Sequence, residues 1–205
     1  SIVSSRLLSR IARAHGLEHH TTLTGFKWIA RAPGLGFGYE EAIGFCPDPA
    51  HVRDKDGIAT SVVAASLAAA LKAQGRSVWD ELERLARLHG LHVSSPLTFR
   101  VEEIEQIASG MARLRAQPPS VLAGSPVVEV SDLSQGYRGL PPTDGVLVLT
   151  EAGDRVIARP SGTEPKLKCY LEVILPVAEG EPLPWEQARE RLDSIKGAFA
   201  EIIGL

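Results

Sequence analysis

The sequence contains few cysteines, few aromatic residues and no long apolar segment. Among 205 residues there are 2 cysteines and 5% aromatic residues. Two cysteines are too few for a disulfide framework, so we expect reduced, non-catalytic thiols in a cytoplasmic protein. No apolar run reaches the ~20 residues of a membrane span. A net charge of −3 gives no attraction to nucleic acids or anionic membranes, so neither is an expected partner.

The first half of the chain carries helical patterns that end at glycines. Apolar spacing predicts a helix over Ser5–His15 and a second over Ile58–Ala73. The second is apolar on nearly all sides, so we expect it to be buried against a sheet. Ser77 can cap a third helix, in which Asp80 would complete a capping box and which Gly90 ends. Strands between these helices would make an α/β unit.

The second half of the chain indicates an antiparallel sheet covered by helices. A Ser-Ser-Pro stretch from about His92 to Thr98 predicts a linker, which divides the chain into domains 1–92 and 93–205. Helices are predicted over Glu102–Ala116 and from Trp185 onward. The β-rich segments are Val127–Val130, Val146–Thr150, Val156–Ala158 and Leu167–Ile174. A short Ala-Gly-Asp turn between the second and third of them predicts antiparallel pairing. The fold class is therefore α/β plus α+β.

One loop has the composition of a phosphate-binding site. It reads RPSGTEPKLKCY, from Arg159 to Tyr170. The guanidinium of Arg159 offers a planar fork of donors to phosphate oxygens, and hydroxyls and backbone N–H groups around Gly162 can close round the rest. The candidate phosphate ligands are Arg159, Ser161, Gly162, Thr163 and Lys166. From composition alone, a strand-linking turn with a basic rim remains an alternative.

A second candidate site combines an acidic pair with a lysine. Glu40 and Glu41 lie in LGFGYEEAIGF, and an ionised carboxylate, which only accepts hydrogen bonds, suits the neighbouring hydroxyls of a pyranose. Lys55 lies in RDKDG, where we expect Asp54 and Asp56 to hold its ammonium group. The alternatives are a solvated strand end and a charged turn. Two carboxylates beside a lysine offer too few ligands for magnesium or calcium, so no metal site is expected.

Four segments, in this order along the chain, resemble the α-D-phosphohexomutases, the superfamily of phosphoglucomutase and phosphomannomutase. They read TLTGFKWI (Thr22–Ile29), GYEEAIGF (Gly38–Phe45), VRDKDGI (Val52–Ile58) and RPSGTEPKLKCY. The resemblance covers nearly the whole chain and is closest to the branch of actinobacterial phosphomannomutases and phosphopentomutase-like phosphoglucomutases. It implies that residues 1–92 are an N-terminally incomplete, α/β sandwich-type, sugar-binding mutase domain 3. Residues 93–205 would be the phosphate-binding domain 4, with a mainly antiparallel sheet packed by helices.

The resemblance also implies how a phosphosugar is held. Glu40 would bind adjacent ring hydroxyls, with Glu41 beside it, and Lys55 would face the ligand. Ala42 occupies a further sugar-binding position, where many relatives have a serine that contacts the sugar, so the contact made by that hydroxyl is missing here. The candidates to meet a second phosphate, or the catalytic phosphoserine, are Thr24, Gly25, Lys27 and Arg31.

The implied activity interconverts sugar 1-phosphate and 6-phosphate through a phosphoserine and a bisphosphorylated sugar. Magnesium would be the cofactor and a sugar 1,6-bisphosphate the activator. The serine and magnesium loops belong to domains 1 and 2, which are absent from these residues, so the chain contains no catalytic residue and should be inactive alone. The expected ligand is a phosphorylated hexose, mannose or glucose phosphate. A phosphopentomutase, or a stand-alone phosphosugar-binding module without catalysis, remains an alternative.

Overall fold

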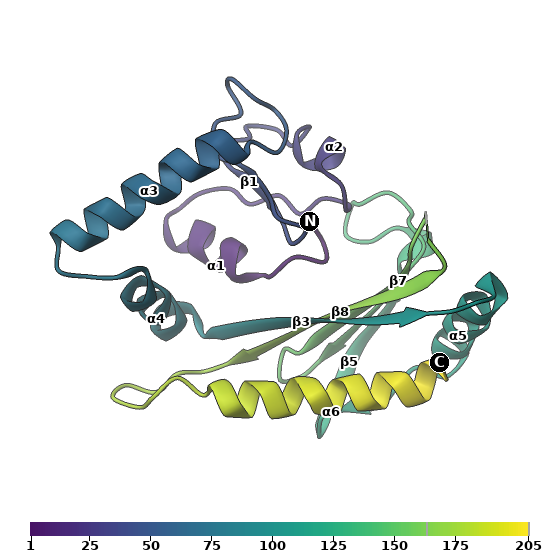
Figure 1. Ribbon diagram of the computed structural model, residues 1–205. Helices are drawn as coiled ribbons and strands as arrows, with labels where there is room; N and C mark the ends of the chain where they lie inside the picture. The colour runs from purple at the N-terminus through teal and green to yellow at the C-terminus, as the bar shows by residue number, and fades with distance from the viewer. Residues whose placement is uncertain (163, 205) are drawn as a thin grey trace. The chain divides into compact units, whose positions relative to one another are not determined.

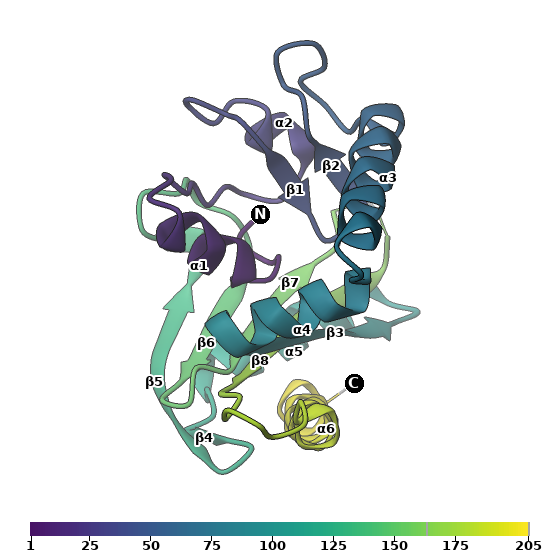
Figure 2. The same cartoon turned by 90° about the vertical axis from the view of Figure 1, so that its left-hand side faces the viewer.

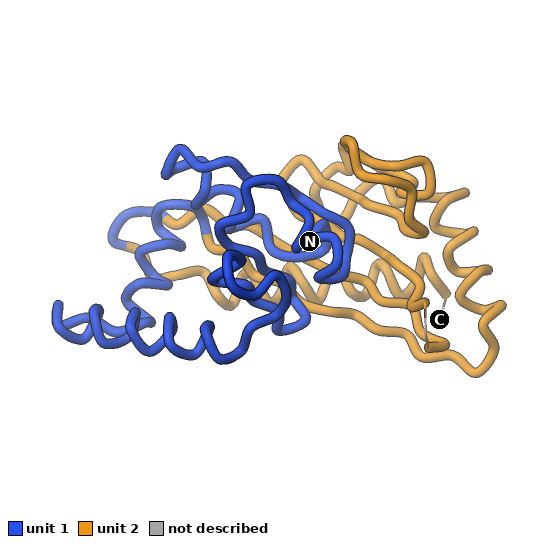
Figure 3. The backbone as a smooth tube through the Cα atoms, turned by 90° about the horizontal axis from the view of Figure 1, so that it is seen from above, with its two compact units in different colours: residues 1–90, 178–180 blue, residues 91–177, 181–205 orange. Residues whose placement is uncertain are grey.

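The computed structural model of the chain describes residues 1–162 and 164–204 (Figure 1). Its backbone forms two compact units, shown in two colours in Figure 3. The first contains Ser1–Gly90 and Ala178–Gly180, and the second contains Leu91–Val177 and the chain from Glu181 onward. Each unit has its own helices and its own sheet.

The first unit consists of helices around one short hairpin. Its elements are α1 (Leu7–Ala14), α2 (Phe26–Ile29), β1 (Gly38–Glu40), β2 (Gly44–Cys46), α3 (Gly57–Ala73) and α4 (Val78–His89). The strands β1 and β2 pair in antiparallel fashion, which places Gly44 opposite Glu40. The predicted capping box of α4 is confirmed, since Ser77 and Asp80 each accept a hydrogen bond from the other's backbone N–H. These bonds hold the pKa of the Asp80 carboxyl below its ordinary value.

Helix α3 forms as predicted, but the prediction that it is buried against a sheet is wrong. Of its 17 residues only Leu71 is buried, whereas residues Ile58 and Val62 are 84% and 62% exposed. The two strands of this unit are three residues each, so they cover little of a helix about 25 Å long.

No single helix in the described residues has the length and apolarity of a membrane span. Helices α3 and α4 reach that length and apolarity only together, across a 90° bend.

The second unit is an antiparallel sheet covered by helices on one face. Its elements are β3 (Leu91–Arg100), α5 (Ile104–Ala116), β4 (Val121–Leu122), β5 (Ser125–Asp132), a 3-10 turn (Leu133–Gln135), β6 (Val146–Thr150), β7 (Arg155–Pro160), β8 (Lys166–Leu175) and α6 (Trp185–Ile203). The strand order is β3-β8-β7-β6-β5-β4, and all pairs are antiparallel. Helix α6 runs along one face of this sheet (Figures 1 and 2), and α5 packs against α6, β6 and β8. The predicted antiparallel sheet packed by helices is confirmed.

The predicted linker from His92 to Thr98 is wrong, because these residues belong to strand β3. This strand pairs with β8 along its whole length, from Leu91 opposite Leu175 to Arg100 opposite Lys166. It lies at the edge of the sheet and therefore needs partners on one side only. An edge strand tolerates a proline, whose missing N–H breaks no ladder when it faces away from the sheet. The Ser-Ser-Pro composition therefore marks an edge strand in this chain.

Candidate functional site

A buried carboxylate and a half-exposed ammonium group meet at the hairpin of the first unit. The Nζ atom of Lys55 lies 2.6 Å from Oε1 of Glu40, whose side chain is 7% exposed against 41% for the lysine. The same ammonium group donates a hydrogen bond to the backbone carbonyl of Ala42 at 3.1 Å. The pair offers an acceptor and a donor side by side, with the donor open to solvent. Such an arrangement can bind hydroxyl groups or an anion.

The hairpin can bring this pair together only because residue 44 is a glycine. A Cβ atom on Gly44 would lie 2.8 Å from Cγ of Glu40 and 2.8 Å from Cε of Lys55. It would also lie 3.1 Å from the ring of Phe26. A Cβ atom essentially never lies within 3.0 Å of a non-bonded heavy atom. Gly44, the second glycine of GYEEAIGF, therefore makes room for the charge pair.

We expect Gly44→Ala to destabilise the chain by about 1–3 kcal/mol, because overpacking a filled site forces side chains and backbone to move. Urea denaturation of the full chain would measure this change. Gly57→Ala is the matched control, since an added Cβ there meets nothing within 4 Å, and alanine at a helix position is neutral or favourable. Equal stability of the two variants would show that Gly44 is not crowded.

The expectation that Asp54 and Asp56 hold the ammonium group of Lys55 is wrong. Asp54 accepts a hydrogen bond from the backbone N–H of Lys55 at 2.7 Å. Asp56 caps helix α3 by accepting from the backbone N–H of Ala59 at 2.9 Å. Short acidic side chains often bind nearby backbone in this way. The lysine side chain is thereby left to reach Glu40.

Glu41 is held separately from the Glu40–Lys55 pair. Its Oε2 atom accepts hydrogen bonds from the hydroxyls of Ser1, at 2.9 Å, and Ser4, at 2.8 Å. Ala42 contributes its carbonyl to Lys55 but has no side-chain polar atom to offer. The structure therefore joins Glu40, Ala42 and Lys55 in one cluster and places the Glu41 carboxylate in another.

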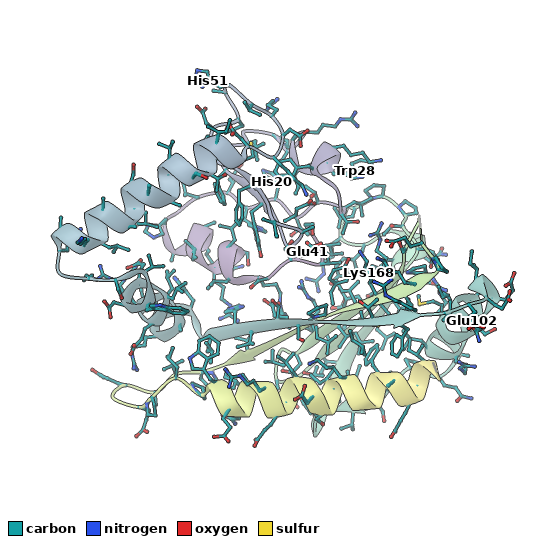
Figure 4. The ribbon with its side chains drawn as sticks, viewed as in Figure 1. His20, Trp28, Glu41, His51, Glu102 and Lys168 are labelled. Carbon is teal, nitrogen blue, oxygen red and sulfur yellow. The ribbon has the colours of Figure 1, made fainter. Side chains whose placement is uncertain are left out.

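The residues around α2 form a basic and aromatic surface. Gly25 precedes the helix with φ 106°, a left-handed conformation that favours glycine. Lys27 lies with its Nζ atom 5.8 Å from the ring centroid of Trp28, which is labelled in Figure 4. Thr24 is half-buried, and Arg31 is exposed and makes no side-chain ion pair within residues 1–162 and 164–204. No described contact links Lys27 or Arg31 to the Glu40–Lys55 pair.

In the second unit, the sequence RPSGTEPK spans the turn from β7 to β8. Strand β7 ends at Pro160 and β8 begins at Lys166. The loop is closed by a backbone hydrogen bond of 2.9 Å from Ser161 to Lys166. Gly162 is exposed, and an added Cβ there would meet nothing within 4 Å. The predicted phosphate ligand Thr163 lies outside the described residues.

Strand register gathers basic side chains next to this loop. Arg159 on β7 pairs with Lys168 on β8, which pairs in turn with Thr98 on β3. Lys166 on β8 pairs with Arg100 on β3. Paired residues in a sheet present their side chains to the same face, and so do residues two apart on one strand. These basic groups therefore share one face at one end of the sheet.

That face is the one opposite helix α6. Lys168 alternates along β8 with Leu167 and Cys169, both of which are fully buried. Figure 4 shows the labelled Lys168 side chain extending away from α6. Burial raises the pKa of the Cys169 thiol to about 12, so it is protonated at neutral pH and unsuited to nucleophilic chemistry. At this end of the sheet the basic face, and not the thiol of Cys169, is therefore the candidate functional group.

The electrostatics of the loop are dominated by positive charge. Lys166 lies 2.5 Å from Oε2 of Glu164. The hydrogen bond from Lys166 to the Glu164 carboxylate holds the pKa of that carboxyl below its ordinary value, and the charges of Lys166, Arg100 and Lys168 act in the same direction. Within the described residues, Arg100, Arg159 and Lys168 have no carboxylate partner of their own. An arrangement with unneutralised cations beside a glycine-containing turn suits an anion such as phosphate.

Sequence reasoning missed Arg100 as a member of this face. The residue follows the segment that was interpreted as a linker, and nothing in its local sequence connects it with the distant loop. Only the pairing of Arg100 with Lys166 brings it there. Only an interpretation of His92–Thr98 as an edge strand could have suggested this position from the sequence.

In the described residues, no three His, Cys, Asp or Glu side chains gather as metal ligands.

Segments in both units match models of one protein family. Residues 1–88 match the model of phosphoglucomutase/phosphomannomutase, alpha/beta/alpha domain III, and residues 97–180 match the model of the C-terminal domain of the same family. The chain belongs to the phosphoglucomutase/phosphomannomutase family. The family resemblance expected from the four sequence segments is thereby confirmed.

The relatives that this chain matches are named for three different mutase activities. The chain is 41% identical to a probable phosphomannomutase of Haemophilus influenzae, over 84% of this chain and 35% of that protein. It is 33% identical to a phosphoglucomutase of Staphylococcus aureus, over 86% of this chain and 35% of that protein. It is 31% identical to a phosphopentomutase of Mus musculus, over 98% of this chain and 36% of that protein. The chain thus spans about a third of the length of these relatives.

A solved structure has the same fold. Parafusin, a phosphoglucomutase from Paramecium, aligns with a TM-score of 0.66 over 99% of this chain and 38% of that protein. The sequence identity is 18%, so this likeness concerns the fold alone. The fold class predicted from the sequence agrees with it.

Proposed function

We propose that this chain is the ligand-gripping C-terminal part of a phosphohexomutase, an enzyme that interconverts sugar 1-phosphate and sugar 6-phosphate. The observation that carries the proposal is the basic face beside the family's RPSGT loop, where Arg159 and Lys168 lack a carboxylate partner in the described residues. Excess positive charge at a short glycine-containing turn favours a bound phosphate group. The proposed ligand is a phosphorylated mannose or glucose.

The two units have separate proposed binding roles. The proposed ligands of the non-reacting phosphate are Arg159, Ser161, Gly162, Thr163 and Lys166. We add Arg100 and Lys168 to this proposal because strand pairing places them beside Lys166 and Arg159. The proposed sugar-binding residues are Glu40, Glu41, Ala42 and Lys55. The proposed contacts to a second phosphate, or to a phosphoserine, are Thr24, Gly25, Lys27 and Arg31. Binding energy at these remote groups would orient the reacting phosphate without taking part in its transfer.

Phosphate transfer itself would depend on domains outside this sequence. We propose that domains 1 and 2 supply the serine that carries the phosphate, and that a sugar 1,6-bisphosphate activates the enzyme. The described residues gather no ligand set for the magnesium that the family generally uses, and we propose that domains 1 and 2 would supply its ligands. The chain alone should bind the ligand but not turn it over. Its unpaired cysteines fit a cytoplasmic parent enzyme.

A pentose phosphate is the second candidate ligand, because the mouse phosphopentomutase aligns with 98% of this chain. The Glu40–Lys55 pair offers one acceptor and one exposed donor, a combination that suits vicinal hydroxyls of either ring. Titration with ribose 1-phosphate beside the hexose phosphates would separate the candidates by affinity. A non-catalytic binding module would bind the same ligands but would lack activity even as part of its full parent protein.

Calorimetric titration of the full 205-residue chain with mannose 1-phosphate and glucose 1-phosphate tests the proposal. We expect Glu40→Gln to weaken binding by about tenfold, because hydrogen bonds from hydroxyls to a charged acceptor contribute about 1.5–3 kcal/mol and the amide retains part of this. Inorganic phosphate, which has no ring hydroxyls, should bind both proteins equally. Glu18→Gln, a change at a 91% exposed side chain, is the control. Unchanged sugar-phosphate affinity in Glu40→Gln would contradict the sugar site.

A further inference from the structure

The loop between β7 and β8 contains its own negative charge. Glu164 lies within it, and its Oε2 atom is 2.5 Å from Nζ of Lys166. A backbone hydrogen bond of 2.7 Å from Lys166 to the carbonyl of Glu164 holds the two residues in a tight turn. The carboxylate side chain is 51% exposed, whereas the lysine is 14% exposed. The acidic group is therefore the more solvent-accessible member of the pair.

Glu164 lies in the electrostatic field that a phosphate group would experience. The charges acting on its carboxylate come from Lys166, Arg100 and Lys168, which share one face of the sheet. Of the basic groups of this face, Lys166 alone has a carboxylate partner in the described residues. An anion that approached Lys166 would meet the Glu164 carboxylate as a like charge and would compete with it for the same ammonium group.

We propose that the Glu164 carboxylate competes with phosphate for Lys166. The carboxylate pairs with Lys166 when no phosphate is bound, and it is displaced when phosphate binds. This inference rests on the proposed function of the loop. Its effect is to lower the affinity for phosphate and to speed its release. A bisphosphorylated sugar that must turn over so that its two phosphates exchange places needs a grip of this kind, strong enough to orient the ligand but ready to release each phosphate.

Titration of the full chain with inorganic phosphate, at constant pH and ionic strength, tests the proposal. Glu164→Gln should bind phosphate up to about fivefold more tightly than the wild type, since an exposed ion pair competes only weakly with a bound anion. Glu201→Gln removes the same charge from α6, on the other face of the sheet, and should change nothing. In a Lys166→Gln background the gain from Glu164→Gln should shrink, because the competition acts through that lysine.

The possible outcomes separate this inference from the function on which it rests. If Arg159→Ala strongly weakens binding while Glu164→Gln leaves it unchanged or weakens it, the loop binds phosphate and the competitor role is wrong. If Glu164→Gln and Glu201→Gln strengthen binding equally, the effect is one of net charge and the proposal fails. If none of the proteins binds phosphate, both the loop's role and the competition are overturned, and the sugar site remains to be judged by Glu40→Gln.

Discussion

Replacing Arg159 with alanine should weaken the binding of inorganic phosphate by roughly a hundredfold. Arginine can form two parallel hydrogen bonds to one phosphate group, and each charge-assisted bond contributes about 1.5–3 kcal/mol. Lys168, the cross-strand partner of Arg159, keeps some positive charge at the site, so residual binding is expected. Titration calorimetry of the wild type and Arg159→Ala measures the difference directly.

The stability of Arg159→Ala should match that of the wild type. The Arg159 side chain makes no ion pair or hydrogen bond in the part of the chain that the structure describes, so its removal breaks no internal contact. Arg159→Lys keeps the charge without the planar fork and should bind with intermediate affinity. Arg189→Ala, on the exposed side of α6, controls for the loss of one positive charge. Binding by Arg159→Ala within threefold of the wild type would show that the loop is an ordinary turn.

Helix ends and regular strands of this fold could be predicted because their signals are local. The box of Ser77 and Asp80 at the start of α4 lies within four residues of sequence, and its physics needs no distant partner. Strand β6 covers the predicted segment Val146–Thr150, since β-branched residues and a following turn suffice to define it. Such elements are set by neighbours along the chain.

The two wrong fold predictions concern the surroundings of an element. The composition of α3 gave its helical state correctly but could not show how much sheet would lie beside it. In strand β3, Ser94 and Ser95 weaken the β pattern, and ten residues of pairing with β8 outweigh that weakness. Both errors have one cause, because burial and pairing depend on residues far away in the sequence.

The same limit applies to the candidate site. The sequence motifs predict Glu40, Lys55 and Arg159 as site residues. They do not show that the Lys55 ammonium group reaches Glu40, while the neighbouring aspartates bind backbone N–H groups. The need for glycine at position 44 appears only when the hairpin is closed. The place of Arg100 beside the loop requires the register of β3 on β8. Residue types are readable from sequence, whereas their partners require the tertiary structure.

Arg191→Ala should have the largest effect on stability, with a loss of about 3–5 kcal/mol, because it leaves a buried charge without its partner. The carboxylate of Asp154 is fully buried at the turn between β6 and β7, 2.7 Å from the guanidinium of Arg191 on α6. Thr150 donates one further hydrogen bond to it at 3.2 Å. The ion pair therefore joins α6 to the sheet that carries the β7–β8 loop. Urea denaturation of the full chain would measure the loss.

A double-variant cycle would show whether the charge or the packing is responsible. Arg191→Met retains the apolar stem, and it should still be strongly destabilising while Asp154 stays charged. Adding Asp154→Asn removes the uncompensated charge and should recover part of the loss. Arg189→Ala, two residues away on α6 and exposed, should fall within about 0.5 kcal/mol of the wild type. If Arg191→Met were as stable as the wild type, the stem and not the ion pair would hold α6 against the β6–β7 turn.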